Sequence, residues 1–339
     1  MRKEVVAGID VSAKTLEVSV EEVDGKIFPL RSFDNSPTGH KDLCRWLTQG
    51  GRKARVVLES TGVYSLPLAL ALNGAQGIDV MVANPKAVKD FAGALMQRSK
   101  SDTKDATSIR EFAKRMPFVP WEPPSEEILE LQQISRRLAA MTVDKTRESN
   151  RLHAMKARGK SSKFVINDIE VNLRHLERRI ELLQTEALRH IASHPDLERA
   201  FKRVTSVKGI AAVSAVQILG EILVLPKDMT VGEWVAHCGL DPREYTSGKS
   251  VKRPTRISKV GNVNLRRALY MPALVAVVWE PHVKAFYEKL LSRDKEKLEA
   301  LVAVMRKLLH AIYGMLKHDT DFCGEKFCAL HAHGAQDPR

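Results

Sequence analysis

The chain has little of what marks secreted or membrane proteins. It contains only four cysteines in 339 residues, and the spacing of Cys44, Cys238, Cys323 and Cys328 gives no disulfide framework. The first residues, MRKEVVAGID, lack the uninterrupted apolar stretch of a signal peptide. The longest apolar run, 268–279, is broken by a proline and is shorter than the roughly 20 residues of a membrane helix. We therefore expect a reduced, cytoplasmic protein with no membrane partner.

Acidic residues are also in short supply. Lys and Arg number 54 against 41 Asp and Glu, which gives a net charge of +13 and a pI near 9.6. Such a charge favours a polyanionic partner, nucleic acid before an anionic membrane. A basic enzyme with a solvated surface is the alternative. The apolar fraction of 44% is enough for real cores, and 339 residues favour two or three structural units.

Residues 1–118 have the pattern of an α/β domain. Asp24-Gly25 is a hairpin turn, and Thr61-Gly62 is a turn that leads into a helix ending at Leu72. Strands are expected at 5–9, 15–20, 26–33, 54–58 and 78–83, and the other helices at 38–47 and 85–95. Three meandering strands followed by alternating helices and strands are the element order of a ribonuclease-H-like domain.

Carboxylates stand at the ends of several of these elements. Asp10 ends the first strand, Glu59 ends the fourth, and Asp102 and Asp105 lie three residues apart at the start of a helix. Four convergent carboxylates suit hard divalent cations, which can stabilise both oxygens of a phosphodiester under attack. Read singly, Asp102 and Asp105 also fit a helix cap with its capping-box partner, and Glu59 fits a surface acid.

Residues 119–196 begin with a proline-rich linker and continue with two heptad-like patterns. Apolar residues recur by steps of three and four over 131–155 and over 166–187, and 159–163 separates the two helices. This spacing predicts an antiparallel coiled-coil hairpin or an intermolecular coiled coil, with ordinary core helices as the alternative.

Residues 197–318 are expected to form a third unit and carry the most basic stretch. Residues 206–212 resemble the phosphate-binding turn of a helix-hairpin-helix, although Ala211 stands where the second glycine is usual. Ser247 lies in a basic stretch, and Asn262 is expected to cap the next helix with two arginines directed to the same side. The candidate nucleic-acid-binding residues are Lys249, Lys252, Arg253, Arg256, Lys259, Arg266 and Arg267.

The hydroxyl of Ser247 could attack a phosphate neutralised by this basic stretch. From chemistry alone, a nucleic-acid-binding loop with an idle serine is the alternative. Thr246, Ser250 and Ser258 are competing hydroxyls. For the C-terminal tail, 319–339, a disordered end is favoured over a zinc site. Its candidate zinc ligands, which include the preceding histidine, are His318, Cys323, Cys328, His331 and His333.

Several motifs together resemble the insertion-sequence-110 type of bacterial DEDD transposases. In the first half these are GIDVSAKTLEV with Asp10, LESTGVY with Glu59, the Asn84-Pro85 pair, and SDTKDA with Asp102 and Asp105. In the second half they are FxxVxSVKGI, WVAHCGLDPREYTSGKS and GNVNLRRALYMPA. The resemblance covers about residues 5–313.

This resemblance implies a RuvC-like (ribonuclease-H-like) domain, a central coiled-coil hairpin and a mainly helical C-terminal transposase domain. It implies that Asp10, Glu59, Asp102 and Asp105 hold Mg²⁺ (or Mn²⁺), and that Ser247 forms a covalent phosphoserine. Members are understood as recombinases guided by a structured bridge RNA that pairs with donor and target double-stranded DNA. A dimer that assembles to a tetramer, associated with the nucleoid when bound to DNA, is also implied.

Three other functions compete with this interpretation. One is a metal-dependent, structure-specific nuclease in which Ser247 only binds phosphate; it would survive Ser247→Ala, whereas a recombinase would not. A non-catalytic RNA- or DNA-binding scaffold is the second, and the intact acidic set argues against it. An actin-like kinase is the third, but the later glycine-rich phosphate loops are missing and the basic stretch would have no role.

Overall fold

The computed structural model describes residues 4–60, 62, 64–95, 102–247 and 251–330; within these ranges, the side chains of 102–103, 244–247 and 251–254 are not described. The chain divides into two compact units, 1–123 and 124–339, called unit 1 and unit 2 below. In the described part, no helix is both long and apolar enough to cross a membrane.

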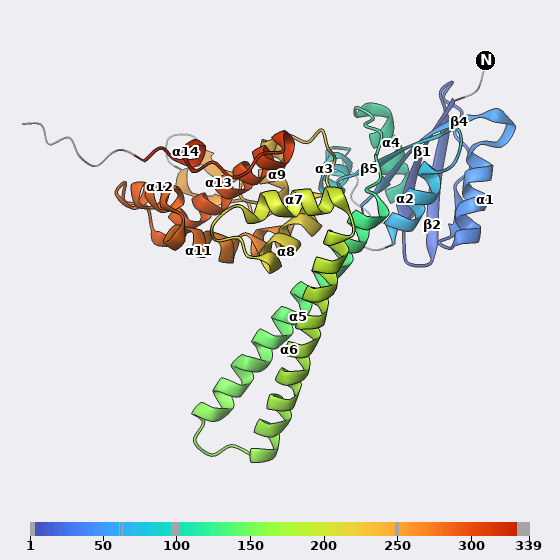
Figure 1. Ribbon diagram of the computed structural model, residues 1–339. Helices are drawn as coiled ribbons and strands as arrows, with labels where there is room; N and C mark the ends of the chain where they lie inside the picture. The colour runs from blue at the N-terminus through green and yellow to red at the C-terminus, as the bar shows by residue number, and fades with distance from the viewer. Residues whose placement is uncertain (1–3, 61, 63, 96–101, 248–250, 331–339) are drawn as a thin grey trace, which may run out of the picture. The chain divides into compact units, whose positions relative to one another are not determined.

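Unit 1 is a five-stranded mixed sheet with helices on both faces (Figure 1). The strand order is β3-β2-β1-β4-β5; β1 pairs antiparallel with β2 and parallel with β4. The elements are β1 (Glu4–Val11), β2 (Thr15–Glu22), β3 (Arg31–Asp34), α1 (Pro37–Leu47), the short 3₁₀ helix Gln49–Gly51, β4 (Lys53–Glu59), α2 (Ser65–Asn73), β5 (Ile78–Ala83), α3 (Pro85–Ala94) and α4 (Asp102–Arg115). This mixed sheet agrees with the predicted ribonuclease-H-like domain.

The central strand β1 presents apolar side chains to both layers of helices. Val5, Ala7 and Ile9 belong to the core that also contains residues of α1 and α2. Val6 belongs to a second core, with Ile109 and other residues of α4. Because successive strand residues point to opposite faces, Gly8 and Asp10 share the α4 face with Val6.

The absence of a side chain at Gly8 allows the backbone of α4 to pack directly against the backbone of β1. A Cβ atom at Gly8 would lie 2.1 Å from the backbone nitrogen of Arg110 and 2.5 Å from the carbonyl oxygen of Ala106. Val6, nearer the start of β1, packs beside Ile109 and Phe112, which lie later in α4. The helix therefore runs against the direction of β1, and its first turn lies toward the end of that strand.

A buried ion network fixes α4 to β2. Arg110 is 4% exposed; its Nη1 donates to the hydroxyl of Ser19 at 2.9 Å, and its Nε lies 3.2 Å from Glu21 Oε2. Lys114 adds a contact to Glu21 Oε1 at 2.6 Å. Buried charges are costly unless paired, so this network favours one position of α4 along the sheet.

The third strand is shorter than predicted. A strand was expected over 26–33, but β3 begins at Arg31, and Ile27 forms only an isolated bridge to Glu21. Pro29 lies in the part that does not pair, and proline has no N–H to donate to a neighbouring strand. The rest of the predicted order of strands and helices in unit 1 is confirmed.

Unit 2 consists of a long helical hairpin and a bundle of shorter helices (Figure 1). Its elements are α5 (Glu126–Ala157), α6 (Lys163–Ala192), α7 (Pro195–Thr205), α8 (Ala212–Ile222), α9 (Val231–Cys238), β6 (Pro242–Ser247), β7 (Val251–Ile257), α10 (Val263–Ala268), α11 (Tyr270–Trp279), α12 (Pro281–Leu291), α13 (Lys297–His318) and α14 (Gly324–Phe327).

Helices α5 and α6 lie side by side and antiparallel (Figure 1). Leu131, Leu138 and Leu176, all at predicted apolar positions, are buried. Ion pairs join the two helices, from Lys145 to Glu177 at 3.0 Å and from Lys156 to Glu170 at 2.9 Å. That this hairpin has coiled-coil geometry or pairs with a second chain stays a prediction.

The segment after α13 is packed against the bundle, so the expectation of a disordered end is wrong for residues 319–330. Phe327 is 4% exposed and belongs to the bundle core, and Arg203 pairs with Asp319 and Asp321 at 3.0 and 2.7 Å. The apolar and acidic residues at the start of the supposed tail provide these contacts. His331 and His333 lie outside the described residues, so the zinc alternative stays untested there.

Replacing Gly8 by alanine should destabilise unit 1. The added Cβ would clash with the backbone of α4, and overpacking of this kind costs about 1–3 kcal/mol. Gly93→Ala in α3 is the control, because its Cβ would meet no atom within 4 Å and alanine favours a helix. Denaturant unfolding should show a loss for Gly8→Ala and none for Gly93→Ala; equal stabilities would contradict the close contact.

Candidate functional site

Asp10 and Glu59 occupy the ends of neighbouring parallel strands. The last registered pair between β1 and β4 is Ile9 with Leu58, so the next residues, Asp10 and Glu59, stand at the same level. Ile9 and Leu58 face the core with α1 and α2. By alternation, Asp10 and Glu59 face α4, and both residues are half-buried.

The start of α4 lies toward the same edge. Ala106 packs on Gly8, two residues before Asp10, and Asp105 precedes Ala106 in the first turn of α4. Asp105 is half-buried, and Asp102 is the first residue of the helix. The register of β1, β4 and α4 thus directs three of the predicted acids toward one edge of unit 1, with Asp102 one turn before Asp105.

The donor chemistry of this acidic edge, defined by Asp10, Glu59 and the first turn of α4, fits a hard divalent cation. Carboxylate oxygens are the preferred ligands of Mg²⁺ and Mn²⁺. Among the described side chains, no three His, Cys, Asp or Glu lie close enough together to hold a metal ion. The side chain of Asp102 is outside the described part. The metal role of the four acids therefore stays a prediction.

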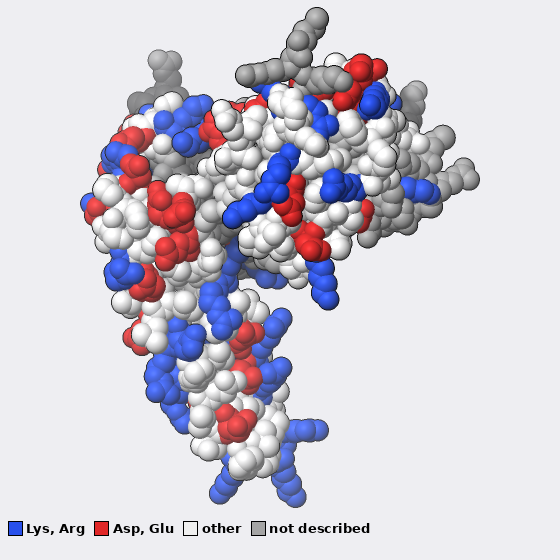
Figure 2. Space-filling view, turned by 90° about the vertical axis from the view of Figure 1, so that its right-hand side faces the viewer, with Lys and Arg blue, Asp and Glu red and all other residues white. Residues whose placement is uncertain are grey.

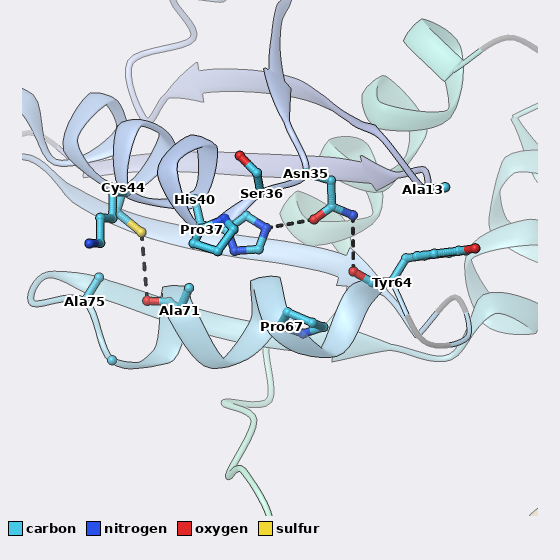
Figure 3. Close-up of a pocket in the computed structure, with 12 residues that line it drawn as sticks. Ala13, Asn35, Ser36, Pro37, His40, Cys44, Tyr64, Pro67, Ala71 and Ala75 are labelled. Atoms are coloured by element: carbon cyan, nitrogen blue, oxygen red, sulfur yellow. Dashed lines mark hydrogen bonds between the residues drawn. The ribbon is translucent and has the colours of Figure 1, made fainter.

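Asn35 ties together the segments that follow the two acidic strand ends. Its Nδ2 donates to the carbonyl of Ser12, after Asp10, at 2.8 Å. It also donates to the carbonyl of Tyr64, after Glu59, at 3.3 Å (Figure 3). Its Oδ1 lies 2.7 Å from Nε2 of His40 on α1. One amide thus holds both segments against a buried helix residue.

His40 lies on the wall of an apolar cavity of about 780 Å³ between α1 and α2 (Figure 3). Burial lowers the pKa of His40 below its usual value, so the neutral ring is favoured. A neutral imidazole can donate one hydrogen bond from Nε2 to Asn35 Oδ1 while the Asn35 amide donates to both carbonyls. The contact therefore stabilises the orientation of Asn35.

In unit 2, Ser247 is the last residue of β6 and pairs with Val251, the first residue of β7. Its backbone therefore lies at the end of a two-stranded antiparallel ribbon. Lys252 and Arg253 continue along β7, opposite Thr246 and Tyr245. Ser247, Lys252 and Arg253 have no described side chain, and Lys249 lies outside the described residues. Their catalytic and binding roles stay predictions.

The hydroxyl of Ser258, a competing candidate nucleophile, forms hydrogen bonds within the protein. It donates to a carboxylate oxygen of Asp241 at 2.5 Å and accepts from the backbone N–H of Val260 at 3.3 Å. Arg256 and Lys259, on either side of it in sequence, are exposed. Those two cations are accessible for the predicted nucleic-acid contact.

Arg266 and Arg267 do not have a common environment, contrary to the expectation that α10 directs them to one side. Arg266 Nη1 donates to the carbonyl of Cys238 at 2.7 Å, at the end of α9. Arg267 is exposed and faces α5 and α8 across a cavity. Adjacent residues of a helix are about 100° apart, which explains the difference.

Burial raises the pKa of the Cys238 thiol to about 12, so it is not a reactive thiolate.

A buried carboxylate that sequence reasoning missed organises this region. Glu221 on α8 is 1% exposed. Arg136 of α5 donates to it twice, at 2.8 and 3.0 Å, and Nδ2 of Asn262 donates at 2.7 Å. Asn262 also caps α10 as predicted, accepting from the N–H groups of Asn264 and Leu265. Glu221 therefore joins α5, α8 and the start of α10.

A sequence signal for Glu221 existed. It is the one charged residue in the apolar helix AVSAVQILGEI, the same pattern that singled out Asp10. Asn35 had no comparable signal, because its partners are backbone carbonyls of segments distant in sequence. His40 had none either, because its role depends on its contact with Asn35.

Replacing Asn35 by alanine should loosen the segments after β1 and β4. Hydrogen–deuterium exchange should accelerate at residues 11–15 and 62–65, and the free energy of unfolding should fall by about 1–3 kcal/mol for the lost hydrogen bonds. Lys41→Ala is the control, because Lys41 lines the same cavity and is exposed. Equal exchange in the two variants would show that the amide does not hold these segments.

Replacing Arg136 by alanine should destabilise unit 2 by about 1–3 kcal/mol, because it removes a charged partner from the buried Glu221 while Asn262 remains. Arg137→Ala is the matched control, since Arg137 is the exposed neighbour on the same helix. Thermal and denaturant unfolding measure the difference. A loss as large for Arg137→Ala would contradict the role of the buried pair.

Comparison with known proteins identifies the family. A DEDD transposase profile of the IS110 group matches residues 7–155, and the profile of the transposase IS116/IS110/IS902 family matches residues 201–288. Together the two matches cover more than half of the chain.

Two of the named relatives are similar to this chain over most of its length, and a third is similar over less than half of it. The pilin gene-inverting protein of Moraxella bovis is 24% identical over 321 residues, 93% of this chain and 96% of that protein. The protein of the same name from Moraxella lacunata has the same identity and coverage. A 43.6 kDa protein of insertion element IS110 from Streptomyces coelicolor is 25% identical over 146 residues, 43% of this chain and 34% of that protein. The chain therefore belongs to the IS110 family of transposases and is a DNA transposase or recombinase.

Proposed function

We propose that this transposase cuts and rejoins DNA through a covalent phosphoserine at Ser247, assisted by the acidic edge of unit 1. The observation that carries the proposal is the register of unit 1, which directs Asp10, Glu59 and the first turn of α4 toward one edge. Supporting it in unit 2, Ser247 ends a strand beside a basic segment.

In the proposed reaction, the Ser247 hydroxyl oxygen forms a bond to the phosphorus of the scissile phosphodiester. The bond from phosphorus to one DNA oxygen breaks, and that oxygen leaves as a hydroxyl with the proton that serine loses. The phosphoserine keeps a phosphoester bond in place of the broken one. A hydroxyl of another strand then attacks the phosphoserine, which restores Ser247 and joins new DNA ends.

Asp10, Glu59, Asp102 and Asp105 would hold the divalent ion, Mg²⁺ or Mn²⁺. When bound, such an ion supplies electrostatic stabilisation of the phosphate oxygens under attack. The carboxylates would supply the ligand oxygens, and the contact of α4 with Gly8 supports a position of the helical acids toward the strand ends. Asn35 steadies the segments that follow Asp10 and Glu59.

The partners proposed for the reaction are a structured bridge RNA and donor and target double-stranded DNA. The net charge of +13 supports polyanionic partners. Exposed Arg256 and Lys259, near the β6–β7 ribbon, are the described cations proposed to contact them. The basic residues Lys249, Lys252, Arg253 and Arg267 complete the proposed set.

The pilin gene-inverting relatives bear names that describe the inversion of a gene. Inversion requires that both DNA ends stay held between cutting and rejoining, which a covalent intermediate achieves. We extend this type of recombination to the present chain as part of the proposal.

Assembly forms the last part of the proposal. The α5–α6 hairpin would pair chains into a dimer, and two dimers would form a tetramer when donor and target DNA are both bound. The functional divisions proposed are 1–118 for the RuvC-like domain, 119–196 for dimerisation, 197–318 for the transposase domain and 319–339 for the C-terminal segment.

The phosphoserine can be tested by trapping it. Purified protein, its bridge RNA, Mg²⁺ and donor and target duplexes are incubated and resolved on a denaturing gel. A covalent protein–DNA band is expected, and Ser247→Ala should abolish it because the attacking oxygen is gone. Ser258→Ala is the matched control; its hydroxyl is bound to Asp241, so the band should remain.

The same gel separates the proposal from a metal-dependent nuclease. Cut DNA ends without a protein-linked band, unchanged by Ser247→Ala, would contradict the phosphoserine and support hydrolysis. A band lost equally in Ser258→Ala would assign the attack to a different hydroxyl or to a general structural defect.

A further inference from the structure

A cavity of about 430 Å³ opens between α5, α8 and α10 within unit 2. It is lined mainly by residues with polar side chains, and three of them are arginines from two different helices. Arg136 and Arg147 come from α5, and Arg267 comes from α10. We call this cavity the arginine groove. Gln217 of α8 and Asn264 of α10 add amide groups to its wall.

Two of the arginines are available to an external anion. Arg267 is exposed, and among the described residues it has no ion pair or hydrogen bond through its side chain. The side chain of Arg147 is 67% exposed and contacts Asp144 at 3.3 Å. Exposed ion pairs of this kind are worth about 0–1 kcal/mol, so a phosphate can replace Asp144 at little cost.

The third arginine is held in place from behind. Glu221, a buried residue that also lines the groove, accepts hydrogen bonds from Nε and Nη2 of Arg136, which leaves Nη1 for another partner. These bonds raise the pKa of Arg136 above its usual value, so its charge is retained. Glu221 also holds Asn262, which caps the helix of Arg267. The groove is thus built on a fixed polar network.

The hairpin that forms one side of the groove is itself basic. Residues 136–179 contain twelve Lys or Arg and five Asp or Glu. Figure 2 shows Lys and Arg side chains along both flanks of the hairpin, with acidic residues interspersed among them. A nucleic acid backbone lying in the groove would therefore meet further positive charge along α5 and α6.

Chain connectivity relates the groove to the cleavage segment. Helix α10 begins at Val263, six residues after β7 ends at Ile257, and β7 is the next described element after β6, which ends at Ser247. Both ends of this stretch are anchored in unit 2, because Ile257 packs on the bundle core and Leu265 is buried in it. A DNA strand bound in the groove would therefore contact the same unit that carries Ser247 at the end of β6.

We propose that the arginine groove binds the phosphodiester backbone of the DNA duplex that the enzyme recombines. Planar guanidinium groups from two helices suit phosphate oxygens, and the family assignment makes duplex DNA the substrate. This inference rests on the DNA recombinase assignment and is independent of the phosphoserine mechanism.

The test compares two double variants in the full chain. Arg147→Gln/Arg267→Gln removes one weakly paired and one unpaired cation from the groove. Arg293→Gln/Lys295→Gln is the matched control, since it removes the same charge at the turn between α12 and α13, where Lys295 pairs with Glu299 at 3.5 Å. Affinity for a mixed-sequence DNA duplex is measured over a series of salt concentrations, together with thermal unfolding.

The groove variant should bind the duplex on the order of tenfold more weakly at moderate salt. The slope of log affinity against log salt should fall by about 2, because each phosphate contact contributes roughly 0.9. The control should change less in both respects, and thermal midpoints should match, since the replaced side chains are exposed. Restoring charge with Arg147→Lys/Arg267→Lys should recover most of the slope.

Two results would overturn the proposal. One is a groove variant whose affinity and slope equal those of the control, which would show that only overall charge matters. The other is a loss confined to a structured hairpin RNA, measured in parallel, with duplex DNA binding unchanged; this would assign the groove to RNA.

Discussion

The backbone contact between Gly8 and α4 is the constraint on which the candidate site of unit 1 depends. With no Cβ at Gly8, the carbonyl of Ala106 and the amide of Arg110 lie against β1. The ion pair of Arg110 with Glu21 then favours one position of the helix along the sheet. From these two contacts it follows that the first turn of α4, with Asp105, lies toward the strand ends that carry Asp10 and Glu59.

Much of the fold of unit 1 could be predicted because its signals are local. Apolar runs bounded by turns mark the strands, and Asn84-Pro85 marks the start of a helix whose N-cap is indeed Asn84. The predicted start of the third strand was wrong, because the alternation of apolar and polar residues does not take account of the missing N–H of Pro29. The packing of residues 319–330 against the bundle was also not predicted. Phe327 contacts residues of α12 and other parts of the bundle that are far away in sequence.

The candidate site was predictable where a residue departs from its surroundings. Asp10 stands in an apolar strand, and Asn262 precedes a helix that it caps. The contacts that position the site were not predictable, because they join segments distant in sequence. Asn35 bridges the carbonyls after two strands, and Arg266 is used to bind the end of α9 rather than an external anion. The distribution of charged residues in the sequence therefore predicted a basic region. It could not tell which arginines bind within the protein and which are accessible to a nucleic acid.

Convergence of the acidic edge on one metal ion can be measured directly by iron-mediated backbone cleavage. Fe²⁺ replaces Mg²⁺, and ascorbate with hydrogen peroxide then generates hydroxyl radicals that cut the chain close to the bound ion. Fragments ending near residue 10, near residue 59 and within 102–105 are expected together, and excess Mg²⁺ should suppress all three. Cleavage at one of these positions alone, or only at other sites, would contradict a shared metal site.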